Sequence, residues 1–179
     1  MHINPYGEEP TLLAVALLND RPATVRALQA RCDAAGVVHR PGAKRADLVL
    51  LDRYLDEIDR LIDTAQASDR VRLLNELLAR HTAHPRVTDH AGDGFHLHYR
   101  DAEMSYAAML SALLTMGLTV HLVQRGMHRL ARCAVPECET AFADTTKNGK
   151  QRYCSPACAN RDAVRRHRSR HRASTPDVR

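Results

Sequence analysis

Apolar residues recur at three- and four-residue intervals through the first two-thirds of the chain, as they do on the buried face of an amphipathic helix. The pattern predicts helical segments over residues 11–18, 20–36, 48–62, 68–78 and 102–125. We expect Asn19 or Asp20 to cap the second segment, Gly36 to end it, and Gly126 to end the last. The first two-thirds of the chain are therefore predicted to be mostly helical.

The period of the pattern changes to two in the segment RVTDHAGDGFHLHYR, residues 86–100. Apolar and polar residues alternate on both sides of Asp93-Gly94, a dipeptide that favours a two-residue turn between antiparallel strands. Because the chain has no Trp and two Phe, its core is expected to consist of Leu, Val and Ala. The predicted fold class is α+β, mostly α, with one β-hairpin in a helical N-terminal domain.

The composition is that of an ordinary globular protein, with 44% hydrophobic and 26% charged residues among 179. We expect no apolar run long enough to cross a bilayer. The segment TLLAVALLND is too short and lacks the basic start of a signal peptide. The sequence thus predicts a cytoplasmic protein with no membrane partner, in which cysteines are reduced and act as ligands before they form disulfides.

The charge is concentrated at the C-terminal end of the chain. Residues 145–179 hold ten basic and two acidic residues, a net +8, whereas the rest holds 16 basic and 19 acidic residues, a net −3. Such asymmetry indicates a polyanionic partner for this end of the chain and not for the body.

Four of the five cysteines lie in one polar segment that is too poor in apolar residues to build a core of its own. Cys133 and Cys138 form one pair, Cys154 and Cys158 form another, and fifteen residues separate the pairs. Thiolates at this spacing can converge tetrahedrally on one ion, so the predicted cofactor is a structural Zn²⁺ whose binding is coupled to folding. The alternatives are reduced structural cysteines without a metal and, less favoured without a secretion signal, disulfides.

The residues around the cysteines predict how the segment folds. The turn signal at 147–149 should fold the stretch between the two pairs into a hairpin. Ser155 is a suitable N-cap and Pro156 a suitable first residue of a helix that carries Cys158 in its first turn. Knuckle, hairpin and helix together make a treble-clef-like zinc finger. Four thiolates leave no position for water, and the chain has no Gly-rich phosphate loop or nucleophile elbow, so no enzyme is predicted.

The segment contains a set of residues that ends in the tetrapeptide Cys158-Ala159-Asn160-Arg161; the others are Cys133, Cys138, Phe142, Asp144, Thr146, Asn148, Arg152, Tyr153, Cys154 and Ser155. In these residues the segment resembles the CGNR zinc finger family, small bacterial proteins regarded as transcription regulators. Ala159 stands where the family's naming tetrapeptide has glycine, and the second cysteine pair is one residue closer than in many members.

A weaker resemblance extends upstream. The segment LLAVALLND is similar to the opening of the ABATE domain that often precedes this finger. That resemblance implies a regulatory or stress-linked domain with no defined ligand. The predicted domains are an ABATE-like regulatory domain at 1–126, a CGNR-type zinc finger at 127–173 and a disordered tail at 174–179.

A helix beginning at Pro156 would carry two stripes of arginine, whose planar fork binds phosphate bidentately. Asn160 could pair with adenine and Arg161 with guanine; alternatively, Asn160 bonds the knuckle backbone and Arg161 pairs with Asp144. A solvated helix face that keeps the protein soluble is the other reading of the stripes. The candidate nucleic-acid contacts are Asn160, Arg161, Arg165, Arg166, Arg168, Arg170 and Arg172.

Together these observations predict a DNA-binding transcription regulator whose partner is double-stranded DNA. Its N-terminal domain would receive an unidentified effector or protein partner. An RNA-binding accessory factor and a zinc-stabilised protein-interaction module are the alternatives. A homodimer stays open, because Met104, Met109, Leu113 and Met116 would form an exposed apolar face on the long helix.

Overall fold

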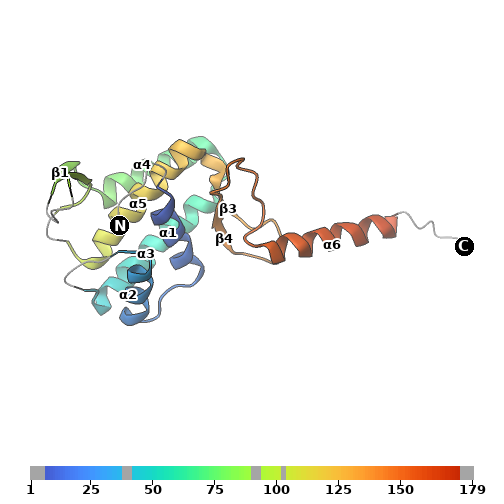
Figure 1. Cartoon of the computed structure of the whole chain (residues 1–179), viewed down its shortest axis with the longest axis horizontal. Coiled ribbons are helices and arrows are strands. Elements are labelled where there is room, and N and C mark those ends of the chain that lie inside the picture. The colour runs from blue at the N-terminus through green and yellow to red at the C-terminus, as the bar shows by residue number, and fades with distance from the viewer. Residues whose placement is uncertain (1–6, 38–41, 90–93, 102–103, 174–179) are drawn as a thin grey trace, which may run out of the picture.

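The computed structural model describes residues 7–37, 42–89, 94–101 and 104–173. The helices of the body are α1 (Glu8–Asn19), α2 (Val25–Ala34), α3 (Arg45–Asp63), α4 (Ala67–His81) and α5 (Tyr106–Arg125). After them come a 3₁₀ turn η1 (Met127–Arg129), strands β3 (Leu130–Arg132) and β4 (Ala141–Ala143), and helix α6 (Pro156–Ala173). Helix α6 projects away from the rest of the molecule (Figure 1). The predicted α+β, mostly helical class is confirmed.

Helix α5 is the centre of the body and packs against α1, α3 and α4. Leu110, Leu114 and Leu118 on α5 are fully buried among leucines and isoleucines of the surrounding helices. The closest approach is at Gly117, where an added Cβ would lie 2.3 Å from Cβ of Pro10 on α1. Glycine at this position therefore lets α1 lie directly against α5.

Helix α5 corrects two sequence predictions. The expectation that no apolar run is long enough to cross a bilayer is wrong, because α5 is long and apolar enough by length and composition alone. In the structure, however, 67% of its apolar window is buried inside the body. The apolar face expected to be exposed is also largely internal, because Met109 is 4% exposed and Leu113 packs against the core. The core of the body thus accounts for the apolar character of this helix.

A buried carboxylate ties the start of α3 to the start of α5. Oδ2 of Asp47 accepts the backbone N–H of Lys44 at 2.7 Å, and Oδ1 accepts that of Ala107 at 2.9 Å. The hydroxyl of Ser105 caps α5 as well, since it accepts the N–H of Ala108 at 3.2 Å. These acceptors satisfy N–H groups that have no partner within their own helices. They also explain why α5 begins at Tyr106 and not near residue 102.

The second helix begins later than predicted, at Val25, because Thr24 is its cap and accepts the N–H of Ala27 at 3.1 Å. Asn19 instead ends α1. The predicted stop at Gly36 is confirmed. Its φ of +71° is left-handed, and the N–H of the following Val37 returns to the carbonyl of Cys32 at 2.8 Å, as in a Schellman motif.

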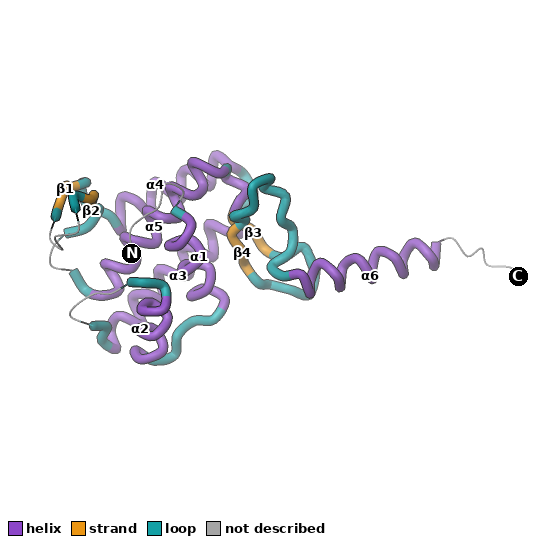
Figure 2. The backbone as a smooth tube through the Cα atoms, in the orientation of Figure 1, coloured by secondary structure: helices purple, strands orange, loops and turns teal. Residues whose placement is uncertain are grey.

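The predicted hairpin in the body is present, with β1 (Arg86–Thr88) antiparallel to β2 (His96–His98) (Figure 2). Its ladder ends where Thr88 pairs with His96, so the connection is longer than the predicted two-residue turn. Asp93 of that turn lies outside the described residues.

Strands β3 and β4 form a second hairpin, and this one belongs to the core of the body. Leu130, Ala141 and Ala143 are buried in the same cluster as the body helices. The Asn19 side-chain amide makes two hydrogen bonds to the backbone of β4: its Nδ2 donates to the carbonyl of Ala141 at 2.9 Å, and its Oδ1 accepts the N–H of Ala141 at 2.8 Å.

The buried side chain of Arg70 on α4 makes a second contact with this hairpin. It donates to the carbonyl of Ile62 on α3 at 2.7 Å and to the carbonyl of Leu130 on β3 at 2.8 Å.

The predicted boundary near Gly126 therefore coincides with the end of α5, but the hydrophobic core continues across it into β3 and β4. The predicted tail at 174–179 lies outside the described residues.

We predict that Asn19→Ala lowers the free energy of unfolding by about 2–3 kcal/mol, because both the N–H and the C=O of the buried Ala141 would lose their partner. Urea unfolding followed by circular dichroism measures the change. The matched control is Asn75→Ala on the exposed side of α4, which should change stability by at most about 0.5 kcal/mol. Equal midpoints for the two variants would contradict the clamping role of Asn19.

Candidate metal centre and basic helix

The first cysteine pair lies in the loop that joins β3 to β4. The N–H of Cys133 donates to the carbonyl of Thr140 at 2.9 Å and so extends the ladder by one bond. The N–H of Cys138 donates to the carbonyl of Val135 at 2.9 Å across a tight turn that contains Pro136. This turn is the predicted knuckle, and it places both sulfurs on the same side of the hairpin.

The second pair lies at the start of α6. Oγ of Ser155 accepts the N–H of Cys158 at 3.3 Å, and Pro156 is the first residue of the helix. The predicted cap and first helical residue are therefore confirmed. The N–H of Ala134 in the knuckle donates to the carbonyl of Arg152 at 2.8 Å and joins the two halves of the site.

The four sulfurs of Cys133, Cys138, Cys154 and Cys158 all lie within 4.8 Å of one another. The Sγ of Cys154 is 3.7 Å from that of Cys138 and 3.7 Å from that of Cys158, and the remaining distance in this triangle is 3.9 Å. A tetrahedron with metal–sulfur bonds of about 2.3 Å has edges of about 3.8 Å. The separations fit such a tetrahedron and are too long for disulfides, whose S–S bond is about 2.05 Å. The segment is a metal-binding module.

The four thiols differ in their burial and in their hydrogen bonds. Cys133 and Cys158 are buried together with Val135 in a small cluster separate from the main core. The hydroxyl of Thr140 lies 3.3 Å from Sγ of Cys138. Hydrogen bonds from Thr140 lower the pKa of Cys138 to about 6, whereas burial and its cysteine neighbours raise the pKa of Cys154 to about 12. The hydrogen bonds of Thr140 thus favour the thiolate of Cys138, the form that binds metal.

The hairpin of the finger is not where the sequence predicted it. The strands flank the first cysteine pair, and the predicted turn at 147–149 is present with Gly149 at φ +64° but joins two irregular segments. The reason is that β3 and β4 pack on the body, whereas residues after β4 are held by side-chain bonds.

Those side-chain bonds converge on Asp144, which is 2% exposed. Its Oδ1 accepts the N–H of Thr146 at 2.9 Å, its Oδ2 accepts the N–H of Gln151 at 3.0 Å, and Arg129 forms an ion pair with it at 3.4 Å. Burial alone would raise the pKa of Asp144, but the hydrogen bonds and the charge of Arg129 outweigh it and lower the pKa. Asp144 is therefore a carboxylate at neutral pH and organises the loop that leads to Cys154.

Helix α6 carries the predicted arginines, and acidic residues hold the first of them. Arg161 and Arg165 each lie 3.6 Å from Glu137 of the knuckle. Arg165 and Arg166 also pair with Asp162, whose Oδ2 accepts the hydroxyl of Tyr153 at 2.6 Å. That hydrogen bond and the two arginines lower the pKa of Asp162 despite its burial. The predicted alternative in which Arg161 pairs with Asp144 is wrong, because Arg129 and the loop backbone occupy that carboxylate.

The remaining candidate contacts lie further along α6. Arg168 and Arg170 are exposed, as are all the side chains from Ala163 to Arg170. Arg172 is in the helix, but its side chain lies outside the described part. Asn160 is exposed and makes no hydrogen bond with the described residues, so the predicted bond to the knuckle backbone is not formed there.

Residues 129–171 match the family model of the CGNR zinc finger. This part of the chain is a CGNR zinc finger. The matched range begins at Arg129, the partner of Asp144, and includes all four cysteines and nearly the whole of α6. The resemblance of the upstream region to the ABATE domain stays a prediction. No curated protein matches the chain.

Three residues important to this site carried no signal in the sequence. The partner of Arg129 is 15 positions away, and the two partners of Glu137 are 24 and 28 positions away. Asn19, at the end of a helix, bonds to a residue 122 positions away. Only the chain's path through space brings these partners together.

We predict that Asp144→Asn destabilises the finger by about 3 kcal/mol at pH 7, because it leaves the buried Arg129 without its counter-charge and removes an acceptor from the loop. Since the pKa of Asp144 is lowered by folding, its contribution is present above the ordinary carboxyl pKa of about 4 and is lost as the pH falls through the folded value. The measurement is chemical unfolding of the zinc-loaded chain. Asp33→Asn, at an exposed site on α2, is the control, and similar stability of the two variants would refute the prediction.

Proposed function

We propose that this protein is a DNA-binding transcription regulator in which a zinc-loaded finger presents α6 to duplex DNA. The observation that supports the proposal best is the position of α6. Its described residues from Ala163 onward are exposed on all sides, contribute nothing to the core, and are rich in arginine.

An α-helix of this kind has the diameter that the DNA major groove admits, and arginine on both sides of it can reach the phosphates of both strands. Arg168 lies on one side and Arg166 and Arg170 on another, so cations surround the helix. Arg161 is near the start of α6 and is the arginine that we assign to a base edge. Its ion pair with Glu137 is exposed and therefore weak enough to exchange for a base.

The ion that we assign to the cysteine tetrahedron is Zn²⁺, since four thiolates in a closed tetrahedral site are its usual structural ligands. Its role is structural and not catalytic. When bound, it would join the knuckle to the first turn of α6 and so set the direction in which the helix leaves the body.

The body, residues 1–126, is assigned a regulatory role as an ABATE-like domain that receives an effector or protein partner in the cytoplasm. Binding of RNA is disfavoured by the shortage of exposed aromatic side chains in the finger, because Phe142 is 6% exposed and the hydroxyl of Tyr153 is bonded to Asp162. Competition of labelled duplex DNA with single-stranded RNA tests this choice. Binding that survives only with an acidic protein would favour the interaction-module alternative.

We predict that the chain, purified without added metal, contains one Zn²⁺ with four sulfur ligands at about 2.3 Å. Cys138→Ser should lose the metal and unfold α6, because metal binding supplies the free energy that the small cysteine cluster cannot. Elemental analysis and X-ray absorption measure this result. Cys32→Ala, at the cysteine outside the cluster, should keep the zinc. A folded finger without metal would contradict the assignment.

We predict that Arg168→Ala weakens binding to every duplex by about fivefold at physiological salt and flattens the salt dependence by nearly one. Arg165→Ala and Arg172→Ala should act in the same way, whereas Arg161→Ala should cost about 1–3 kcal/mol at a single base-pair position. Affinity for a selected and a scrambled duplex is measured across a salt series. The control is Arg53→Ala, an exposed arginine on α3. If the triple variant of Arg165, Arg168 and Arg172 matches this control, α6 is only a solvated helix.

A further inference from the structure

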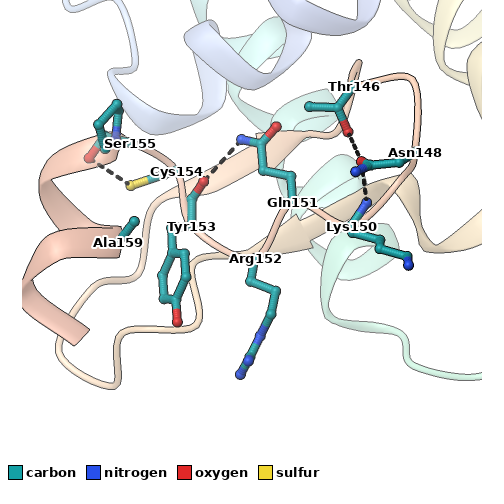
Figure 3. A pocket seen from close by; sticks show the side chains of 10 residues that line it. Thr146, Asn148, Lys150, Gln151, Arg152, Tyr153, Cys154, Ser155 and Ala159 are labelled. Carbon is teal, nitrogen blue, oxygen red and sulfur yellow. Dashed lines mark hydrogen bonds between the residues drawn. The ribbon is translucent and has the colours of Figure 1, made fainter. Parts of the chain in front are cut away.

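A cavity of about 460 Å³ opens between the loop after β4 and the first turn of α6 (Figure 3). The loop lines it with Asn148, Lys150 and Arg152, and Ser155, the cap of α6, closes it together with Ala159 of the helix. Its lining contains two cations and no carboxylate. In this respect it differs from the first turns of α6, where Glu137 and Asp162 hold the nearby arginines.

The two cations of the cavity are electrostatically uncompensated. Among the described residues, neither the ammonium of Lys150 nor the guanidinium of Arg152 has an ion pair, and both side chains are exposed. The guanidinium of Arg152 lies 5.8 Å from the centre of the Tyr153 ring, and the two side chains extend in the same direction (Figure 3). An anion at either side chain would meet a positive charge without displacing an existing ion-pair partner.

The loop that carries these cations is preorganised. Asp144 holds its two ends through Thr146 and Gln151, and Nε2 of Gln151 donates to the carbonyl of Tyr153 at 3.0 Å. Gly149 lies on the guanidinium of Arg129, where a Cβ would be 2.6 Å from Cζ. Lys150 and Arg152 therefore project from a fixed backbone, which lowers the entropy that an anion must overcome on binding.

The cavity is continuous with one face of α6. Ala159 lines the cavity, and Arg166 and Arg170 follow it at seven and eleven residues, a spacing that keeps side chains on one helix face. This face is not the one formed by Arg161, Arg165 and Arg168. The cations from Lys150 to Arg170 thus form a track that begins in the loop and runs along the helix.

We infer that Lys150 and Arg152 at this cavity each bind a backbone phosphate of the nucleic acid beside α6, so that the finger contacts the backbone through the loop as well as the helix. The inference rests on the proposed nucleic-acid binding and adds a second contact element to it. The ligand class is a phosphodiester, because the cavity is open, contains two cations, and lies beside the helix for which we propose phosphate contacts.

Lysine acetylation tests the contact on the unmodified chain, which contains three lysines, at positions 44, 147 and 150. Lys147 is exposed in the same turn but does not line the cavity, and Lys44 lies in the body at the start of α3. The zinc-loaded protein is treated with an acetylating reagent, with and without a 20-base-pair duplex, and each lysine is read by mass spectrometry. Lys150 should be protected by the duplex more strongly than Lys147, and Lys44 should not be protected.

Affinity measurements provide the second arm. The double variant Lys150→Ala with Arg152→Ala should bind the duplex on the order of tenfold more weakly at physiological salt and lower the salt slope by nearly two. Lys147→Ala is the matched control and should leave the slope almost unchanged. The zinc content of each variant, measured on the same samples, verifies that the finger is intact.

The outcomes separate this inference from the proposed function. If the wild-type chain binds the duplex but Lys150 reacts as fast as Lys147 in the complex, or the double variant keeps the wild-type slope, the phosphate site is wrong and the proposed function stands. If the wild-type chain binds no nucleic acid at low salt, both are wrong. Protection of Lys150 by inorganic phosphate at matched ionic strength, equal to that by the duplex, would identify a free-phosphate site and overturn the inference.

Discussion

The pairing of the Asn19 amide with the backbone of Ala141 fixes the finger to the body, and the arrangement of the metal centre depends on it. Strands β3 and β4 have three residues each, too few to be stable as an isolated hairpin. They are held on one side by the core around α5 and on the other by the loop that carries Cys133 and Cys138. Because one hairpin serves both units, the free energy of metal binding also stabilises the contact between finger and body.

The buried pair of Arg129 and Asp144 has a different role. Burying two charges costs free energy that their attraction repays only when further hydrogen bonds satisfy them. Here the carboxylate also accepts backbone N–H groups of Thr146 and Gln151, and the guanidinium supports Gly149. The pair therefore replaces the apolar core that the segment between the cysteine pairs lacks, and it positions the loop beside α6.

The arginines of α6 differ in whether an acidic side chain pairs with them. All the arginines from Arg161 to Arg170 are exposed, but those nearest the metal centre pair with Glu137 and Asp162. The ion pairs with Glu137 are exposed and contribute little to stability, whereas the Asp162 carboxylate that pairs with Arg165 and Arg166 is buried. Towards the loop, the cavity that contains Lys150 has no acidic residue in its lining. The positive charges of this loop are therefore not offset by a carboxylate in the cavity lining.

Short-range patterns in the sequence by themselves determined the helical class, the four cysteines as one ligand set, the cap at Ser155 and the stops at Gly36 and Gly126. The helices, cap and stops depend on residues a few positions apart, and the cysteines on the spacing within two short pairs, so the local pattern contains the physical cause. Contacts across the fold decided the rest. The hairpin formed around the first cysteine pair because β3 and β4 could bury Leu130 and Ala141 against the body. Arg161 pairs with Glu137 and not with Asp144, because the Asp144 carboxylate is paired with Arg129. Pairings of this kind depend on which of several charges lies nearest in space, and only the tertiary structure decides that.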